Sequence, residues 1–424
     1  MISRSTDTAM NPGKIHTQCK EDTTFAWAIT ALVLTFSMIS SAIGEGIENV
    51  PNSRITISRI TPLLNINSKD VFRTLPKAIE SLEWSPDGKS LLVDTQGVNQ
   101  FFSIAIMSTS GEKTSIRQLS NSRDTGNTRL NNSNPCFHKD GKHYVFIGQD
   151  LNSREYARSL PGIGLFSNIC LAKINSPNYW NLTNYVSSYK LAKGAVMPRF
   201  SKDGQMLCWT TCIADAEDRN FWGRRSIAIA KFAFANDTPE LTGIRNYSPS
   251  SNRHPFYETY GFSPDGKSLL FASNLAVNQQ WFTMDICSLN LENGQVTKLT
   301  DTPNDWNRFA AYSPNGKKII YTSSEGFSVP FLGNDAQKWK NELFSELWIM
   351  NSNGTEKRKL SGFNDPGNPF FAKTKAFVGM VTWHPIDPNK IAFILNVRNN
   401  AYTNFASIVI AELSNSTTGN PIRK

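Results

Sequence analysis

Residues 261–274 read GFSPDGKSLLFASN, and this stretch decides the fold. Proline at the second position of its turn fixes φ, aspartate suits the third position, and glycine accepts the positive φ that follows. The run from Ser268 to Ser273 after the turn consists of residues that favour strands. The stretch therefore predicts two antiparallel strands joined by a tight turn.

The same pattern occurs six times along the chain. Each copy has one aromatic residue before its turn, and these are Trp84, Phe137, Phe200, Phe262, Tyr312 and Trp383, spaced 50 to 71 residues apart. A second hairpin follows each copy, as in MDICSLNLENGQVTKLT from Met284. Two hairpins make a four-stranded antiparallel blade, so the repeats predict an all-β, six-bladed β-propeller. The alternatives are a seventh blade in the longest interval, a flat repeat array or two sandwiches.

The two ends of the repeat region predict how the ring closes. The last repeat contains the strand-like run ASIVIAEL from Ala406, but the tail STTGNPIRK after it is a poor strand. The run RITISRIT from Arg54 resembles the strand that is missing there. We expect it to complete the last blade, which gives a propeller domain over residues 54–424.

An apolar segment precedes this domain. Phe25 to Ile43 is a run of 19 residues without charge, long enough for a helix that spans a bilayer. Ser40 and Ala42 also fit the cleavage site of a signal peptide. Residues 1–24 are then a polar tail, 25–43 a signal peptide or transmembrane anchor, and 44–53 a linker. Both interpretations place the propeller in the periplasm or outside the cell; a buried core helix is the alternative.

Charge and cysteine content limit the partners. The net charge is +9, and residues 1–42 contribute nothing to it because their charges balance. A basic propeller suits acidic glycans, phospholipid surfaces or acidic proteins as partners, although its Lys and Arg residues are scattered rather than clustered. No nucleic-acid partner is predicted. Five cysteines follow the apolar segment, at 136, 170, 208, 212 and 287, without the spacing of a disulfide framework. We expect buried, reduced thiols, a mild argument against export.

The sequence lacks the usual catalytic motifs. It has no G-x-S-x-G, H-E-x-x-H, C-x-x-C or P-loop, so no catalytic residue, metal or cofactor is predicted. The turn aspartates, which are Asp87, Asp140, Asp203 and Asp265, occupy one repeated position. A local hydrogen-bonding role explains them.

Binding residues are predicted in the segments that enter the inner strands. Residues 253–260 and 305–308 combine aromatic rings with charges, a composition typical of binding hot spots. The candidate residues for one channel mouth are Arg253, His254, Tyr257, Glu258, Asp305, Trp306 and Arg308, together with Arg129, Arg199 and Lys375 from other blades. Packing of these rings onto blade edges is the alternative. Two long inserts, at about 211–225 and 325–341, are expected at the opposite or outer rim.

The SPDGK turns resemble those of the TolB family of β-propellers, most closely over Gly261 to Ser323. The resemblance spans about 370 residues and implies a periplasmic or surface protein whose channel receives a peptide, protein segment or ligand. TolB carries an α/β domain before its propeller, whereas about 30 residues separate the apolar run from the first repeat here. We therefore expect a monomeric, non-catalytic propeller that binds a protein segment or glycan. The alternatives are a polysaccharide lyase or glycosidase and an intracellular scaffold.

Overall fold

The computed structural model describes residues 54–67, 78–97, 100–109, 116–119, 130–188, 190–215, 222–250, 252, 255–331, 342–400 and 403–416. These residues fall in one compact unit, Arg54–Ser416. The predicted helix over 25–43 lies outside them, so it stays a prediction. Within the described part of the chain, no helix has the length and apolarity needed to cross a membrane.

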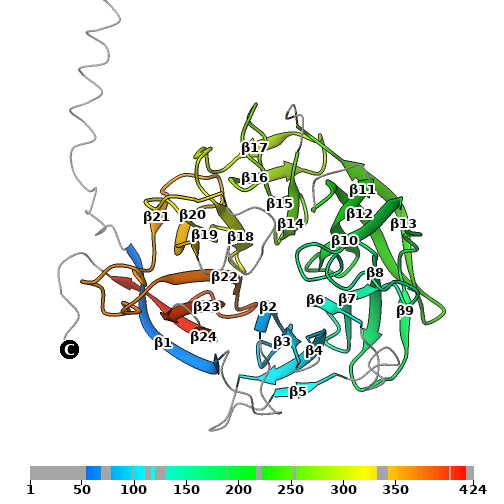
Figure 1. Ribbon diagram of the computed structural model, residues 1–424, viewed down its shortest axis with the longest axis horizontal. Helices are drawn as coiled ribbons and strands as arrows, with labels where there is room; N and C mark the ends of the chain where they lie inside the picture. Colours follow the sequence, from blue (N-terminus) through cyan, green and yellow to red (C-terminus); the bar gives the residue numbers. More distant parts are fainter. Residues whose placement is uncertain are drawn as a thin grey trace, which may run out of the picture. The chain divides into compact units, whose positions relative to one another are not determined.

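Six four-stranded antiparallel sheets surround a central channel (Figure 1). The first blade contains β2 (Ala78–Trp84), β3 (Ser90–Gln96), β4 (Phe102–Ser108) and β5 (Ile116–Gln118). The second contains β6 (Asn132–Phe137), β7 (His143–Gln149), β8 (Ser167–Lys173) and β9 (Tyr179–Asn181). The third contains β10 (Leu191–Phe200), β11 (Met206–Asp215), β12 (Arg224–Ala235) and β13 (Thr238–Tyr247).

The fourth blade contains β14 (Tyr257–Phe262), β15 (Ser268–Ser273), β16 (Asp285–Asn290) and β17 (Val296–Lys298). The fifth contains β18 (Asn307–Tyr312), β19 (Lys318–Ser323), β20 (Glu346–Asn351) and β21 (Arg358–Lys359). The last contains β22 (Ala376–Trp383), β23 (Lys390–Asn400), β24 (Thr403–Ser416) and β1 (Arg54–Asn67). The predicted six-bladed, all-β propeller is confirmed.

The predicted closure of the ring is also confirmed. β1 pairs antiparallel with β24, with Arg54 opposite Ser416 and Asn67 opposite Phe405. The first strand of the domain thus forms the outer edge of the last blade, beside β24 in Figure 1. Because β1 and β24 come from opposite ends of the domain, their pairing fastens the first blade to the last.

The repeated turn is held by its own side chains. In the first blade, the Ser85 hydroxyl donates to Asp87 Oδ1 at 2.6 Å, and the Lys89 amide donates to the same oxygen at 3.1 Å. Gly88 takes a φ of +71° and donates its amide to the Ser85 carbonyl at 2.8 Å. Asp203 and Asp265 accept the same hydrogen bonds in their blades. These aspartates have the local role that the sequence predicts.

Each inner strand carries a β-bulge near its middle. The register shifts lie between Ile79 and Leu82, Ser133 and Cys136, Val196 and Arg199, Thr259 and Gly261, Arg308 and Ala311, and Val378 and Val381. Every bulge adds one residue to the inner strand, which reverses the alternation of side chains beyond it. Asn134, Met197 and Phe309 take positive φ at these points. The bulges therefore divide the channel lining into an upstream and a downstream part.

The five cysteines from Cys136 onward are all free and buried. Cys208 and Cys212 lie on one strand, β11, as expected. Burial raises the pKa of the Cys136 thiol to about 12. A thiol that stays protonated and shielded from solvent reacts slowly. The thiols are buried and unpaired, as the sequence predicts.

Candidate binding site in the channel

The first cavity lies at the upstream ends of the inner strands and holds about 940 Å³ of empty space, part of it open to solvent. Inner-strand residues from all six blades line it. The loops that join the second and third strands of four blades contribute Pro161 and Gly162, Trp222, Trp281 and Phe282, and Leu343. These loops and the entries to the inner strands lie at the same end of a propeller, so they form one mouth.

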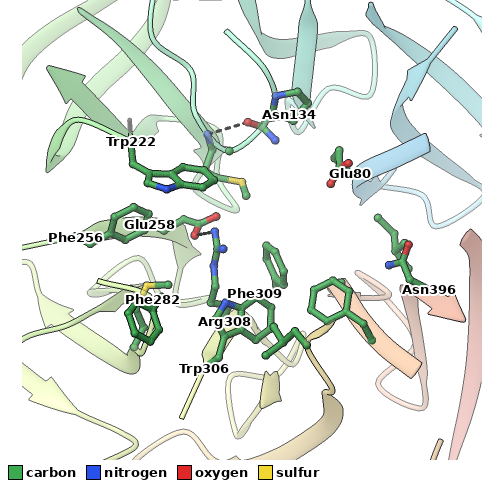
Figure 2. Close-up of a pocket in the computed structure, with 18 of the residues that line it drawn as sticks. Glu80, Asn134, Trp222, Phe256, Glu258, Phe282, Trp306, Arg308, Phe309 and Asn396 are labelled. Carbon is green, nitrogen blue, oxygen red and sulfur yellow. Dashed lines mark hydrogen bonds and ion pairs between the residues drawn. The ribbon is translucent and has the colours of Figure 1, made fainter. Parts of the chain in front are cut away.

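Aromatic rings make up one wall of this cavity. Figure 2 shows Trp222, Phe256 and Phe282 on the side opposite Glu80 and Asn396. Ring centroids lie 5.8 Å apart for Trp222 and Trp281, and 5.6 Å apart for Trp281 and Phe282. The wall continues through Trp306, whose centroid is 5.6 Å from Phe309 and 5.3 Å from Phe377. Contacts of this kind hold large rings in place with little loss of entropy on binding.

An ion pair is set into the aromatic wall. Arg308 Nη2 donates to Glu258 Oε2, joining the fifth blade to the fourth. The Glu258 side chain is 0% exposed and that of Arg308 is 16% exposed. Burial alone would lower the pKa of Arg308, but Glu258 and Tyr260 together outweigh burial and raise it. Glu258 Oε1 and Arg308 Nε have no hydrogen-bond partner, so the pair keeps one acceptor and one donor unused.

A second arginine supports the wall from behind. Arg225 is 4% exposed, and its Nη2 donates to the Gly162 carbonyl. Its guanidinium lies 4.2 Å from the centroid of the Phe256 ring. Burial lowers the pKa of Arg225. The contact with Gly162 ties the start of β12 to the β7–β8 loop, and so fixes two segments of the mouth relative to each other.

The opposite wall is polar and depends on a buried carboxylate. Asp94 on β3 accepts hydrogen bonds from the amides of Glu80, Ser81 and Asn134 at 2.9, 2.8 and 3.0 Å. The Ser81 hydroxyl also donates to it. Burial raises the pKa of Asp94 to about 6. Asp94 therefore holds the bulges of two neighbouring inner strands, β2 and β6, and with them Glu80 and Asn134 of the cavity lining.

The structure brings together three of the predicted binding residues. Glu258, Trp306 and Arg308 line the first cavity. Tyr257 is fully buried and packs against Phe271, because it faces the space between blades. Asp305 borders a separate hollow beside the β15–β16 loop, where burial raises the pKa of its carboxyl.

The remaining predicted residues lie elsewhere. Arg199 lines a second cavity at the downstream ends of the inner strands, so it does not share a mouth with Arg308. Lys375 is engaged by Glu342, whose carbonyl and carboxylate oxygens lie 3.0 and 3.3 Å from Nζ. Arg129, Arg253 and His254 lie outside the described residues.

Several lining residues were missed by the sequence interpretation. Trp222 belongs to the first long insert, which was expected at another rim, yet it lines the first cavity. Phe331, from the described start of the second insert, has its ring 5.2 Å from that of Phe282. Both inserts thus reach the same mouth. Their aromatic residues, in loops beyond ordinary turn length, were the available signal.

The described residues contain no cluster of three or more His, Cys, Asp or Glu side chains arranged to hold a metal ion.

Comparison with known proteins places the chain at the level of its fold. No protein-family model and no curated protein matches it. Among solved structures, a TolB from Agrobacterium tumefaciens is 18% identical with a TM-score of 0.44, over 73% of this chain and 89% of that one. TolB from Acinetobacter baumannii is 15% identical with a TM-score of 0.42, over 78% and 63%.

Peptidase propellers match as well. Prolyl oligopeptidase B from Galerina marginata, solved with a 25-residue macrocyclization substrate, is 13% identical with a TM-score of 0.44. This match covers 75% of this chain and 38% of that protein, so the chain spans well under half of the peptidase. At these identities the likeness extends to the fold alone. In blade number and strand order, the chain is a six-bladed β-propeller of four-stranded antiparallel blades.

Proposed function

We propose that this propeller binds a segment of another protein in its first cavity and does not catalyse a reaction there. The observation that carries the proposal is the aromatic wall with the buried Glu258–Arg308 pair inside it. Tryptophan and arginine in a desolvated pocket are the residues that contribute most to binding between proteins. The empty space of about 940 Å³ suits a few side chains of an inserted segment.

The charges of the cavity disfavour an acidic glycan as its ligand. An acidic glycan would need unneutralised cations. Arg308, the cation of this lining, is already paired with Glu258.

The enzyme alternative requires two carboxylates with different proton affinities. Glu80 and Glu258 both line the cavity, from the first and fourth blades. The Glu258 side chain is 0% exposed and accepts a hydrogen bond from Arg308, so it is poorly placed to exchange a proton with a substrate. The cavity therefore supports binding better than acid–base cleavage.

We further propose that the propeller works outside the cytoplasm, with residues 25–43 as a cleaved signal peptide or an anchor. The argument from cysteine content against export is weakened, because the five thiols are buried and resist oxidation. An intracellular scaffold would require that the apolar segment is neither cleaved nor inserted.

A peptide selection tests the binding function. A displayed library of random peptides is selected on the full-length protein and on a Trp281→Ser/Phe282→Ser variant. Val277→Ser is the matched control, since Val277 lies on the same β15–β16 loop, is 71% exposed and does not line the first cavity.

We expect peptides rich in apolar residues that bind the wild-type and Val277→Ser proteins alike, and the double variant at least about tenfold more weakly. Mass spectrometry after incubation should recover these peptides intact. Equal binding to all three proteins would remove the first cavity as the site, and cleaved peptides would establish an enzyme instead.

A further inference from the structure

The second cavity contains about 1000 Å³ of empty space and lies at the downstream ends of the inner strands. The residue directly before the aromatic anchor of each repeat lines it in all six blades. This ring consists of Glu83, Cys136, Arg199, Gly261, Ala311 and Thr382. Phe309 borders both cavities, so its side chain lies between them along the channel.

The two halves of this ring differ in size and charge. Blades four to six contribute the small residues Gly261, Ala311 and Thr382, which leave space in the channel. Gly261 has a φ of +133°, and a Cβ placed on it would lie 3.8 Å from Cβ of Arg199. Absence of a side chain there keeps the space beside Arg199 open.

Arg199 faces this space with few strong partners. The residue is 7% exposed, and its Nη1 donates to the Pro198 carbonyl at 3.0 Å. Its Nη2 meets the Met380 thioether, a weak acceptor, at 3.4 Å, and the Cys136 thiol is a further weak partner of Arg199. Nε lies 3.9 Å from Glu83 Oε2, beyond hydrogen-bond distance. A buried guanidinium normally has stronger acceptors than these.

We propose that the second cavity is a carboxylate-binding site centred on Arg199. The planar fork of a guanidinium matches the two oxygens of a carboxylate. Glu83, Arg199 and Lys202 are the charged residues among those that line the cavity, and they leave one net positive charge. The carboxylate group that meets Arg199 balances that charge. The site is separate from the first cavity and does not depend on the function proposed for it.

Calorimetric titration with glutarate tests this site on the full-length protein. Arg199→Met removes the guanidinium, and Ala311→Leu keeps Arg199 but fills part of the same cavity. Arg245→Met is the matched control, because Arg245 is an exposed residue of the same blade on its outer strand β13. Thermal denaturation of each variant separates lost binding from lost folding.

We expect glutarate to bind the wild-type and Arg245→Met proteins equally. Arg199→Met and Ala311→Leu should weaken binding at least about tenfold, with Ala311→Leu as stable as the wild type. Equal affinity of the Arg199→Met protein would overturn the proposal. So would the absence of saturable binding both of glutarate and of the peptide pool described next.

A second arm distinguishes a free small carboxylate from the end of a peptide chain. A pool of short peptides with free C-terminal carboxylates is compared with the same pool after C-terminal amidation. If only the free-acid pool displaces glutarate, the natural ligand is a chain terminus. If neither pool displaces it while Arg199-dependent glutarate binding persists, the ligand is a small carboxylate.

Discussion

Replacing Asp94 with alanine should destabilise the propeller more at pH 4 than at pH 7. The carboxylate accepts hydrogen bonds from the buried Ser81 and Asn134 amides, and each amide left without an acceptor costs roughly 1–3 kcal/mol. Their loss therefore amounts to about 2–6 kcal/mol at any pH. Part of this is offset at neutral pH, because the ionised Asp94 side chain itself destabilises the fold.

The offset follows from the pKa of Asp94. Burial raises this pKa from 3.8 to about 6, so the ionised form destabilises the folded state by roughly 3 kcal/mol at pH 7. Between these two values the folded state keeps a proton that the unfolded chain releases. The destabilisation is therefore complete above about pH 6 and lost as the pH falls toward 3.8. At pH 7 the expected change therefore runs from a gain of about 1 kcal/mol to a loss of about 3 kcal/mol, and at pH 4 the loss should be close to the full range of about 2–6 kcal/mol.

Urea denaturation at both pH values measures this difference. Asp87→Ala is the matched control, because hydrogen bonds from Ser85 and Lys89 lower the pKa of that carboxyl. A carboxyl with a lowered pKa stabilises the fold while it is ionised, and this stability is lost as the pH falls. Asp87→Ala should therefore reduce the free energy of unfolding less at pH 4 than at pH 7. An Asp94→Ala effect that is equal at both values, or larger at pH 7, would refute the reasoning.

Three further substitutions or deletions test individual contacts. Arg308→Met leaves the buried Glu258 charge unpaired and should lower the free energy of unfolding, measured with urea, by about 3–5 kcal/mol. Adding Glu258→Leu should restore most of this stability. A double variant no more stable than Arg308→Met would contradict the pairing. Gly194→Ala places a Cβ 1.9 Å from the Gly164 carbonyl oxygen and should lower the denaturation midpoint. Gly367→Ala is the control, because its Cβ would have no atom within 4 Å, and it should leave the midpoint unchanged. Equal midpoints would show that the β7–β8 loop shifts easily to admit the methyl group. Deleting residues 54–67 exposes the edge of β24, so the melting temperature should fall. The exposed edge should also pair with other molecules and give oligomers in size-exclusion chromatography. A monomer with an unchanged melting temperature would show that ring closure does not need β1.

The blades could be predicted from the sequence because the signal for each one is local. The turn at Ser85 to Gly88 is held by hydrogen bonds within four residues, so every copy specifies its own hairpin. The closing strand could also be predicted, because the last repeat lacks its outer strand. The hairpins depend on near neighbours, whereas the pairing of β1 with β24 joins distant segments and was predictable only because the repeat count leaves one strand missing.

The lining of the channel could be predicted only in part, because the bulges change which residues face it. Arg199 lies one residue before its aromatic anchor and Arg308 lies four before its own, with a bulge between these positions. The two arginines therefore belong to different cavities, although both are in inner strands. Trp222, Trp281 and Phe282 come from loops outside the repeat, whose paths depend on packing between blades.

Photo-crosslinking from inside the first cavity tests the central claim most directly. Phe282 is replaced by benzoylphenylalanine in the full-length protein, with the same replacement at Val277 as the control, and a selected peptide is added before irradiation. We predict that position 282 crosslinks to the intact peptide and that position 277 does not. Equal crosslinking at both positions, or a crosslinked fragment of the peptide, would contradict non-catalytic binding in the channel.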